Sequence, residues 1–518
     1  MAAGTLGSRI LGLFRDQVIA AMFAAATTDA FFVAFTIPNV LRQLLAEGAV
    51  QNAALPVLER VREQSGEDAA RRVFASMRGL SWLSLLLVTI LGVVFTEPIV
   101  ELFAPGYRHY PGQFERTVRL ARWLFPYIFF MGTAALGAAA LNVHRRFVVS
   151  SFAPGLLNVA FILASFALPA WLIHHHQDPV MALAAGALTG GLLQVVAQWP
   201  SLRKIGYWGR PRLSLSDPAI RESLRRMGPV LIGVGVYYID VVVARRFLSE
   251  LGVGAQSYFG WALRLCDFPQ GIFVMALQAA TLPSLSRLVA RRELGEVTET
   301  FSYAMRLTLF VGIASSVAMI VLAEPLTILL FQRGHFDATS AHETARALMA
   351  QGLGVWMVAA VRQLVSVYYA FGDTKTPVRV AAIDLCVFIV LAYLLRRPLG
   401  HVGVGLAVSA ASFAQMVLLW SNLRRHLGRN TQFGRIVHSA VKTTAAAALA
   451  GVLARWVAWA STPSQAANAW VRACPGMLSG ILFAFAFLVF AWLLGSEELR
   501  TLTAAVRRKR LHVSKCSH

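Results

Sequence analysis

The sequence predicts an all-α polytopic membrane protein with about fourteen transmembrane helices. Of its 518 residues, 57% are hydrophobic and only 14% are charged, whereas a soluble chain carries about 25% charged residues. Apolar stretches of about 20 residues, enough to cross a hydrocarbon core of about 30 Å as a helix, recur along the whole chain. Because lipid offers the backbone no hydrogen-bond partners, such stretches must be helical.

The membrane-spanning segments are separated by short connectors that hold most of the charge and have turn chemistry, such as Ala104-Pro105-Gly106 and Asp178-Pro179. The spans are expected near residues 4–24, 29–48, 78–103, 120–143, 147–173, 179–199, 227–248, 255–282, 304–323, 345–371, 378–395, 402–422, 437–457 and 475–495.

Positive charge is distributed unequally between the two sets of connectors. Even-numbered connectors and the C-terminal tail hold 30 of the 48 Lys and Arg residues, and odd-numbered connectors hold 12. Since the face richer in Lys and Arg is the cytoplasmic one, both termini are predicted to be cytoplasmic. The net charge of +22 is then explained by orientation and anionic headgroups, and no nucleic-acid partner is expected.

An internal repeat divides the spans into two lobes. Residues 51–60 (QNAALPVLER) align with residues 278–287 (QAATLPSLSR) with six identities in ten, and at the same offset of 227 residues Glu97-Pro98 aligns with Glu324-Pro325. An even number of spans separates the copies, so the repeat is parallel. Parallel repeats build two-lobed transporters with a site between the lobes. The predicted domains are an N-lobe at 1–205, a C-lobe at 206–425 and a C-terminal helix pair with a basic tail at 426–518.

Charged residues inside the predicted spans mark the candidate site. Each one costs at least about 2.5 kcal/mol by insertion scales, so it usually faces a cavity or a partner. Helix-to-helix pairing is the simpler explanation for any one of them, since neighbours three residues apart can satisfy each other. The charges within or at the ends of spans include Arg9, Arg15, Asp16, Asp29, Arg42, Asp240, Arg264, Asp267, Arg362 and Asp384.

The arginines of this set belong to predicted spans 1, 2, 8 and 10, which are elements of both lobes. Arginine is permanently charged, and its donors match phosphate and carboxylate oxygens. The set therefore indicates a substrate that carries phosphate or carboxylate groups. The sequence contains no nucleotide-binding P-loop, zinc-ligand pair at helical spacing or serine nucleophile elbow, and the four cysteines are dispersed. A transporter without a cofactor is expected, rather than an enzyme.

Short motifs follow one another along the chain, most densely at the N-terminus. They are Ser8-Arg9-Ile10-Leu11-Gly12, Arg15-Asp16, Thr28-Asp29-Ala30-Phe31-Phe32, Ile37-Pro38-Asn39, Leu41-Arg42, Ala46-Glu47-Gly48-Ala49, Phe125-Pro126-Tyr127, Phe152-Ala153-Pro154, Met227-Gly228-Pro229, Asp267-Phe268-Pro269-Gln270-Gly271 and Lys375-Thr376-Pro377-Val378. Together they resemble the MurJ (MviN) family of lipid II flippases, in the multidrug/oligosaccharidyl-lipid/polysaccharide (MOP) exporter superfamily. The resemblance extends over essentially the whole chain.

The resemblance implies two six-helix lobes plus two C-terminal helices that shape a lipid groove, in a bacterial inner (cytoplasmic) membrane. It implies alternating access that moves lipid II, undecaprenyl-diphosphate-MurNAc-pentapeptide-GlcNAc, from the cytoplasmic to the periplasmic leaflet. Lipid II and membrane lipids are the expected partners, and the oligomeric state is left open. Carried over by motif, the substrate-binding cavity comprises Arg9, Arg15, Asp29, Arg42, Arg264, Asp267 and Arg362.

The sequence departs from the family pattern around the arginine of span 8. Leu263 stands where the family has an acidic residue just before that arginine, and Asp267 is a shorter acid than the family uses three residues after it. In span 10, Arg362 replaces a residue that is often lysine, which keeps the charge but changes its geometry.

A sodium ion is a candidate coupling ion, since some members of the family bind sodium through acidic residues on spans 7 and 11. Asp240 and Asp384 lie at comparable places, and Ser409 on span 12 could add an oxygen ligand. Hard cations prefer such oxygen ligands. The alternative, two carboxylates that are hydrogen-bonded locally or protonated, stays open.

Two other transport functions remain as alternatives. A flippase for another lipid-linked oligosaccharide, such as an O-antigen or exopolysaccharide unit, would share the two lobes but usually lacks this arginine set. A drug/cation antiporter would favour an acidic, aromatic cavity. A membrane-embedded glycosyltransferase would need catalytic carboxylates on a large external loop, and no predicted connector is long enough.

Overall fold

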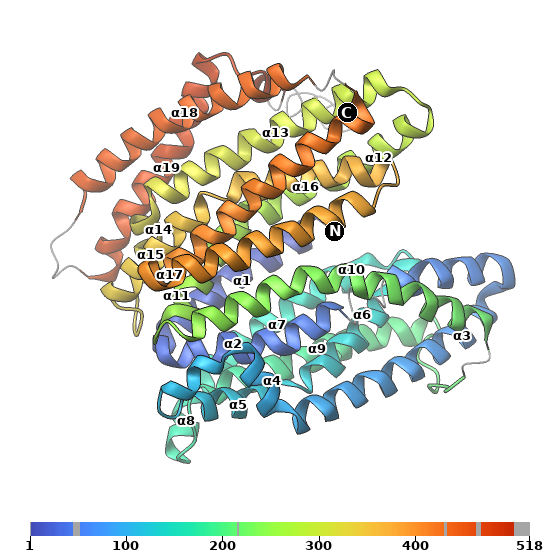
Figure 1. The fold of residues 1–518 in the computed structure, drawn as a ribbon. Coiled ribbons are helices and arrows are strands. Elements are labelled where there is room, and N and C mark those ends of the chain that lie inside the picture. The colour runs from blue at the N-terminus through green and yellow to red at the C-terminus, as the bar shows by residue number, and fades with distance from the viewer. Residues whose placement is uncertain (1, 45–51, 215–216, 429–431, 463–467, 502–518) are drawn as a thin grey trace, which may run out of the picture. The chain divides into compact units, whose positions relative to one another are not determined.

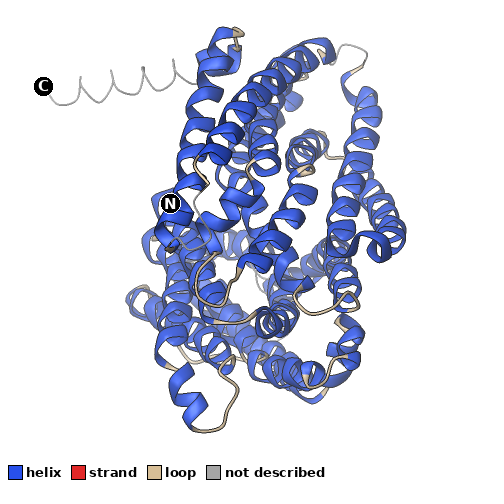
Figure 2. Ribbon diagram, turned by 90° about the vertical axis from the view of Figure 1, so that its left-hand side faces the viewer, coloured by secondary structure: helices blue, strands red, loops and turns tan. Residues whose placement is uncertain are grey.

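The computed structural model describes residues 2–44, 52–214, 217–428, 432–462 and 468–501. Every regular element in these ranges is helical, and they contain no strand (Figures 1 and 2). The predicted fold class is therefore confirmed. The predicted end of span 29–48 lies outside the described residues, as does most of the basic tail.

Ten helical segments of the described chain are long and apolar enough to cross a membrane. The segment Lys375–Leu427 contains two of the predicted spans, divided by a bend at Gly400, whose φ of +60° places it in the left-handed region that favours glycine. The helices that cover the first, second and seventh predicted spans are not among the ten. The count of fourteen stays a prediction.

The chain divides into two compact units, residues 1–257 and 258–518. The boundary falls in the first turn of α11 (Ala255–Pro269). The three-part division expected from the repeat, with limits at 205 and 425, stays a prediction.

Unit 1 is a bundle of helices around α7 and α9. α7 packs against α9 and α1, α6 packs against α9 and α3, α2 packs against α5, and α10 packs against α3. Its helices are α1 (Ala2–Met22), α2 (Ala25–Arg42), α3 (Asn52–Val94), α4 (Thr96–Phe103), α5 (Gln113–Leu124), α6 (Tyr127–Val143), α7 (Phe147–Ala167), α8 (Pro169–His174), α9 (Met181–Lys204) and α10 (Pro218–Ser249), with a 3-10 turn η2 (Pro105–His109).

The connector between α9 and α10 is held on α3 by a buried arginine. Arg78 of α3 is only 3% exposed, and its guanidinium donates to the carbonyl oxygens of Tyr207 and Gly209. It also lies over the rings of Trp82 and Trp208, 5.5 and 5.1 Å from their centroids. A guanidinium over an aromatic ring gains cation–π attraction, so the connector is fixed to the bundle.

Unit 2 is built on α13, which packs against α12, α16 and α18, while α18 packs against α19 and α16 against α17. After α11, its elements are a π-helical turn η3 (Gln270–Val274), α12 (Met275–Ala290), α13 (Leu294–Val321), α14 (Ala323–Phe331), α15 (Ala338–Gly352), α16 (Val355–Ala370), α17 (Lys375–Leu427), α18 (Phe433–Ala460) and α19 (Ala469–Leu493).

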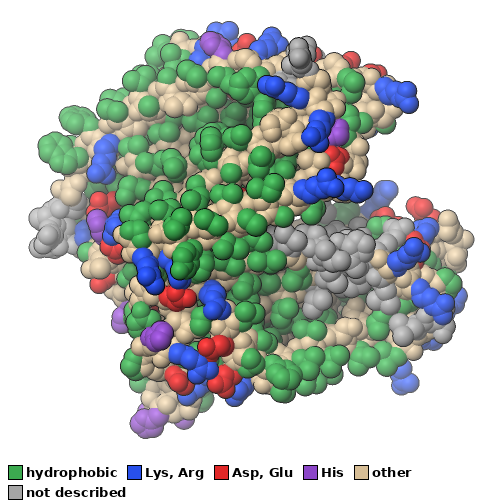
Figure 3. Space-filling model, in the orientation of Figure 1, with side chains coloured by type: hydrophobic (Ala, Val, Ile, Leu, Met, Phe, Trp, Pro, Cys, Tyr) green, Lys and Arg blue, Asp and Glu red, His purple; other side chains and the backbone are tan. Residues whose placement is uncertain are grey.

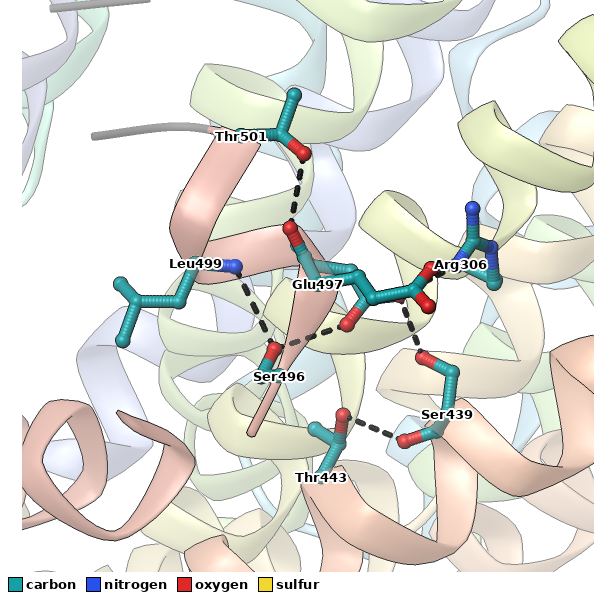
Figure 4. Close-up of polar contacts among 8 residues, drawn as sticks. Arg306, Ser439, Thr443, Ser496, Glu497, Leu499 and Thr501 are labelled. Atoms are coloured by element: carbon teal, nitrogen blue, oxygen red, sulfur yellow. Dashed lines mark hydrogen bonds and ion pairs between the residues drawn. The ribbon is translucent and has the colours of Figure 1, made fainter. Parts of the chain in front are cut away.

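A polar cluster ties the last turn of the described chain to α13 and α18 (Figure 4). Arg306 of α13 contacts Glu497 at 2.5 Å and Glu498 at 3.3 Å. The Glu498 carboxylate, in a residue that is 4% exposed, also accepts from the hydroxyls of Ser439 and Ser496 at 2.9 and 2.8 Å. A buried carboxylate with three donors is well satisfied, so α18 and the segment after α19 are fixed to α13.

Large apolar side chains are exposed on the outer faces of both units. On α3, Leu83, Leu87, Ile90 and Val94 follow helical spacing and are at least 50% exposed. Figure 3 shows hydrophobic side chains over large parts of the helices that face the viewer. Such surfaces are stable in lipid rather than in water.

Candidate functional site

Arg15 is the centre of a polar network between α1 and α7. Its Nε and Nη2 donate to Oδ1 of Asp16 at 2.9 and 2.6 Å, and its Nη1 donates to Oδ1 of Asn158 at 3.0 Å. The Asn158 amide in turn donates to the carbonyl oxygen of Ser8 at 3.0 Å. The Arg15 side chain is only 12% exposed. Its charge is therefore balanced by Asp16, and its predicted contact with substrate stays a prediction.

Arg9 and Arg42 lie on the two first helices of unit 1, and both side chains are partly exposed. Arg9 is on α1, six residues before Arg15. Arg42 is the last residue of α2, where its Nε donates to Oδ1 of Asn39 at 3.0 Å. A cation at a helix C-terminus is favoured by the helix dipole, and partial exposure leaves guanidinium edges that can reach a ligand.

Asp29 is fully buried on α2 and holds the start of α11. It is 0% exposed, and its two oxygens accept the backbone N–H groups of Gly254 at 2.6 Å and Ser257 at 2.7 Å. The hydroxyls of Thr28 and Ser257 form a third link at 2.6 Å. A carboxylate at a helix N-terminus satisfies orphan donors and meets the positive end of the dipole. The geometry therefore assigns Asp29 a positioning role, and its contact with substrate stays a prediction.

Arg264 and Asp267 lie one turn apart on α11, and both side chains are exposed. Leu263 beside them is 37% exposed. Exposed charges on a membrane-spanning helix must face water or a polar partner. Directly after Asp267 the helix passes through Pro269 into the π-helical turn η3. Such turns often occur at functional sites, which agrees with the prediction that this part of span 8 contacts the substrate.

Arg362 lies on α16 with a partly exposed side chain. The backbone around it is linked to α12, since the carbonyl oxygen of Arg362 accepts from the Gln278 amide at 3.4 Å and from the hydroxyl of Ser366 at 3.0 Å. Gln278 begins the second copy of the internal repeat. The repeat motif therefore helps to set the position of Arg362 within unit 2.

The residues of the predicted sodium site fall in both units: Asp240 lies on α10, and Asp384 and Ser409 lie on α17. Oδ1 of Asp384 is buried and has no hydrogen-bond partner in the described ranges, whereas the Ser409 hydroxyl donates to the carbonyl oxygen of Ala350 at 2.7 Å. Within those ranges no group of three or more His, Cys, Asp or Glu side chains could hold a metal ion. Sodium can also use carbonyl and hydroxyl oxygens, as hard cations do.

Sequence reasoning did not identify the residues of a long apolar groove in unit 2. The groove has a volume of about 1040 Å³ and lies between α13, α16, α17 and α18. Apolar groove residues have the same hydropathy as lipid-facing ones, so a single sequence cannot distinguish them. The groove is lined by Met305, Leu309, Ile313, Ser316, Val317, Ile320, Leu353, Trp356, Ala360, Met416, Val417, Trp420, Ser421, Arg424, Phe433, Ile436, Val437, Ala440, Val441, Thr444, Ala445 and Ala448.

One end of this groove is polar. Arg424 and Ser421 lie in the last two turns of α17, and Phe433 begins α18 beside them. The rest of the lining is almost entirely aliphatic or aromatic. A cavity of this kind suits an amphiphile with a long hydrocarbon chain and an anionic group at one end.

The fold has clear likenesses among solved structures. A lipid II flippase MurJ in an inward closed conformation matches with a TM-score of 0.76 at 24% identity, over 95% of this chain and 97% of that one. An inward-facing MATE family multidrug resistance transporter of the MOP superfamily matches with a TM-score of 0.66 at 16% identity, over 82% of this chain and 96% of that one. The chain shares the fold of these two transporters.

Similarity in sequence identifies the family more specifically than similarity in fold does. The lipid II flippase MurJ of Burkholderia cenocepacia is 33% identical over 503 residues, which cover 95% of each chain. The probable lipid II flippase MurJ of Vibrio cholerae is 34% identical over 474 residues, 89% of this chain and 90% of the relative. The family model described as lipid II flippase MurJ matches residues 18–471. The chain belongs to the MurJ family, and it is a multi-pass membrane protein.

Proposed function

We propose that this protein is a lipid II flippase, which carries the undecaprenyl-diphosphate-linked peptidoglycan precursor from the cytoplasmic to the periplasmic leaflet by alternating access. The observation that carries the proposal beyond family membership is the groove beside α18, with Arg424 at one end. A polyprenyl chain needs a continuous apolar path, and a diphosphate needs guanidinium donors. Transporters that carry only small solutes need no such apolar path.

The arginines of the predicted cavity support an anionic substrate. Arg9, Arg42 and Arg362 have partly exposed side chains, and Arg264 is exposed. Since each of them would be costly in lipid without a polar surrounding, an anionic substrate gives them a common purpose. The diphosphate and the peptide carboxylates of lipid II have that chemistry.

A transport assay with a matched pair of groove variants tests this function. Ala440 lines the groove on α18, whereas Leu449 of the same helix is 48% exposed and does not line it. We expect Ala440→Trp to reduce lipid II translocation in proteoliposomes at least about tenfold, and Leu449→Trp to leave it near wild type. Equal transport by both variants would exclude the groove as the path of the lipid chain.

Depletion in cells tests the substrate itself. Loss of the protein should cause lipid II to accumulate on the cytoplasmic side and the cells to lyse. If lipid II does not accumulate, the substrate is another molecule. Charge-neutralising Arg9, Arg42 and Arg264 singly should abolish complementation, while immunoblotting shows that each variant still reaches the membrane.

We further propose that transport is coupled to sodium through Asp240 and Asp384. The buried, unpartnered Oδ1 of Asp384 supports this assignment, because such an oxygen is costly unless a cation or proton meets it. We expect Asp384→Asn to remove the sodium dependence of transport. Ser409→Ala should weaken it less, because the Ser409 hydroxyl donates to the carbonyl oxygen of Ala350 and would offer a cation only its oxygen lone pairs. Unchanged sodium dependence in Asp384→Asn would refute the coupling site.

The orientation is also a proposal, and it places both termini in the cytoplasm of a bacterial inner membrane. It is supported by the excess of Lys and Arg in the even-numbered connectors. A reporter that is active only outside the cytoplasm should be inactive when fused after residue 518 and active when inserted in the connector around Gly112. The reverse pattern would invert the orientation.

A further inference from the structure

A second pocket of unit 2 lies toward the other end of α18 from Phe433 and shares only Ile320 with the lining of the groove. It has a volume of about 230 Å³ and is formed by the junction of α13 and α14, by α15 and by α18. It combines an apolar wall with charged side chains. Its lining residues are Ile320, Val321, Ala323, Glu324, His342, Ala345, Arg346, Met349 and Arg455.

Two guanidinium groups from different helices line this pocket, and some of their N–H groups have no acceptor within the described part of the chain. Arg346 of α15 contacts both oxygens of Glu343 at 3.1 Å, but it does so through Nη1 alone. Its Nε and Nη2, and the whole guanidinium of Arg455 on α18, make no hydrogen bond or ion pair within the described part of the chain. Guanidinium groups placed in this way can bind the oxygens of a phosphate.

The other charged side chains near the pocket limit the charge of the phosphate compound that it can bind. Glu324 Oε1 lies 4.0 Å from Nδ1 of His342, and both side chains are at least half exposed. The carboxylates of Glu324 and Glu343 offset much of the charge of the two arginines. A multiply charged anion is therefore disfavoured relative to a phosphodiester, which carries a single charge.

The depth of the pocket in the membrane follows from the length of α18. Arg435 and Arg455 lie 20 residues apart on this helix, a rise of about 30 Å, which matches the thickness of the hydrocarbon core. Trp456 and Trp459, 64% and 75% exposed, follow Arg455 directly. Since tryptophans gather at the level of the headgroups, the pocket lies in the interface at the face that the charge count predicts to be periplasmic.

We propose that this pocket binds a membrane phospholipid, with Arg346 and Arg455 on its phosphodiester and the wall of Ile320, Val321 and Met349 against the start of an acyl chain. An anion from the aqueous phase would need no apolar wall and no neighbouring tryptophans. The proposal does not depend on the identity of the transported substrate, because none of the predicted cavity arginines lines this pocket.

Unit 1 provides a natural control for this site. At the repeat offset of 227 residues, Arg119 of α5 aligns with Arg346, and it lines a pocket of about 240 Å³. That pocket also has two guanidinium groups, but both come from α5, and Arg116 is paired with Asp178, with Nε 2.6 Å from Oδ2. Since the carboxylates of Glu115 and Asp178 line it as well, Arg119→Gln should leave lipid retention unchanged.

Native mass spectrometry of the full-length protein in detergent tests the proposal. Wild type, Arg346→Gln, Arg455→Gln and Arg119→Gln are titrated with phosphatidylglycerol, phosphatidylethanolamine, diacylglycerol or inorganic phosphate. We expect the wild type and Arg119→Gln to retain a phospholipid, and each pocket variant to bind it about tenfold more weakly. Loss of one charge-assisted contact is worth about that factor. Arg455→Gln is the cleaner variant because it disturbs no internal ion pair.

The competing ligands decide the remaining alternatives. Retention of diacylglycerol as strong as that of a phospholipid would show that only the acyl chain is bound, and would overturn the proposal. So would displacement of the lipid by millimolar inorganic phosphate, or equal retention by wild type and Arg455→Gln. Unfolding temperatures of the variants, expected to match the wild type because both arginines are exposed, show that lost retention is not lost folding.

Discussion

Oδ1 of Asp29 accepts the backbone N–H of Ser257 at 2.7 Å, joining two positions 228 residues apart in the sequence. The second oxygen accepts Gly254 N–H at 2.6 Å, and the whole residue is inaccessible to solvent. Asp29 thus caps the first turn of α11, the helix that contains Arg264, while its predicted place in the substrate cavity stays a prediction.

Replacing Asp29 should therefore weaken folding as well as transport. In Asp29→Ala the buried N–H groups of Gly254 and Ser257 lose their acceptor, and each unsatisfied donor costs about 1–3 kcal/mol. Asp29→Asn keeps one acceptor oxygen and should lose less. Thermal unfolding in detergent measures the difference, with Thr27→Ala as a neighbouring control. An unfolding temperature for Asp29→Ala equal to that of the control would contradict the capping role.

The network of Arg15, Asp16 and Asn158 should behave as one unit. Lysine has a single ammonium group and cannot reproduce the contacts that the guanidinium makes with both partners. We expect Arg15→Lys and Asn158→Ala each to destabilise the protein by about 1–3 kcal/mol. Their effects should not add, with a coupling energy of about 0.5–3 kcal/mol in a double-mutant cycle. Additive effects would show that α1 and α7 are held together by other contacts.

Asp373, in the connector before α17, should give a stability that depends on pH. Burial alone would raise the pKa of its carboxyl, but hydrogen bonds from Thr376 and His426 outweigh burial and hold the pKa at about 2. In an unfolded chain the pKa is about 3.9. Because the folded value is the lower one, the contribution is complete above pH of about 4 and is lost as the pH falls toward 2.

Unfolding temperatures of wild type and Asp373→Asn, measured between pH 7 and pH 2.5, test this dependence. The wild type should have the higher unfolding temperature at neutral pH, and the difference between the two proteins should narrow as the pH drops below about 4. Thr376→Val removes one of the donors to the carboxylate. Its unfolding temperature should differ less from that of the wild type than the value for Asp373→Asn does, and this difference should also narrow at low pH. A difference between wild type and Asp373→Asn that stays constant over this range would mean that Asp373 does not titrate as the structure indicates.

Hydropathy was sufficient to predict the all-helical fold, but not where each helix begins and ends, since several predicted spans cover two separate helices, as 345–371 covers parts of α15 and α16. Lipid leaves the backbone no alternative, so apolar length alone determines the element. Side-chain partners could not be predicted in the same way. Nothing in the sequence near Arg15 indicates that Asn158, 143 positions away, would accept a hydrogen bond from its guanidinium.

Turn chemistry was informative at Gly400. Pro398-Leu399-Gly400 was expected to be a connector between two spans, and in the structure the non-helical backbone of Gly400 separates two helices at a kink. Glycine adopts that φ at little cost, which is why the motif marks the change of direction. The groove beside α18 could not be predicted in this way, because its residues look like any lipid-facing surface in a single sequence.

The two adjacent glutamates after α19 provide the sharpest test of an individual contact (Figure 4). Both contact Arg306 of α13, but the Glu497 side chain is 66% exposed and the Glu498 side chain only 4%. Ion pairs at the surface contribute about 0–1 kcal/mol because water and salt screen them. Removing the buried Glu498 carboxylate leaves Arg306 its contact with Glu497, but the buried hydroxyls of Ser439 and Ser496 lose their acceptor. An unsatisfied buried donor costs about 1–3 kcal/mol.

We therefore expect Glu498→Ala to lower the free energy of unfolding by about 1–3 kcal/mol, and Glu497→Ala to change it by no more than about 1 kcal/mol. The hydroxyl of Ser439, which donates to Glu498 at 2.9 Å, links the contact to α18, and α18 forms one wall of the groove. Glu498→Ala should consequently also reduce lipid II transport, measured at a temperature where the variant remains folded. If the two variants are equally stable, Glu498 does not fix α18, and the groove must be held by the apolar contacts between α13 and α18 alone.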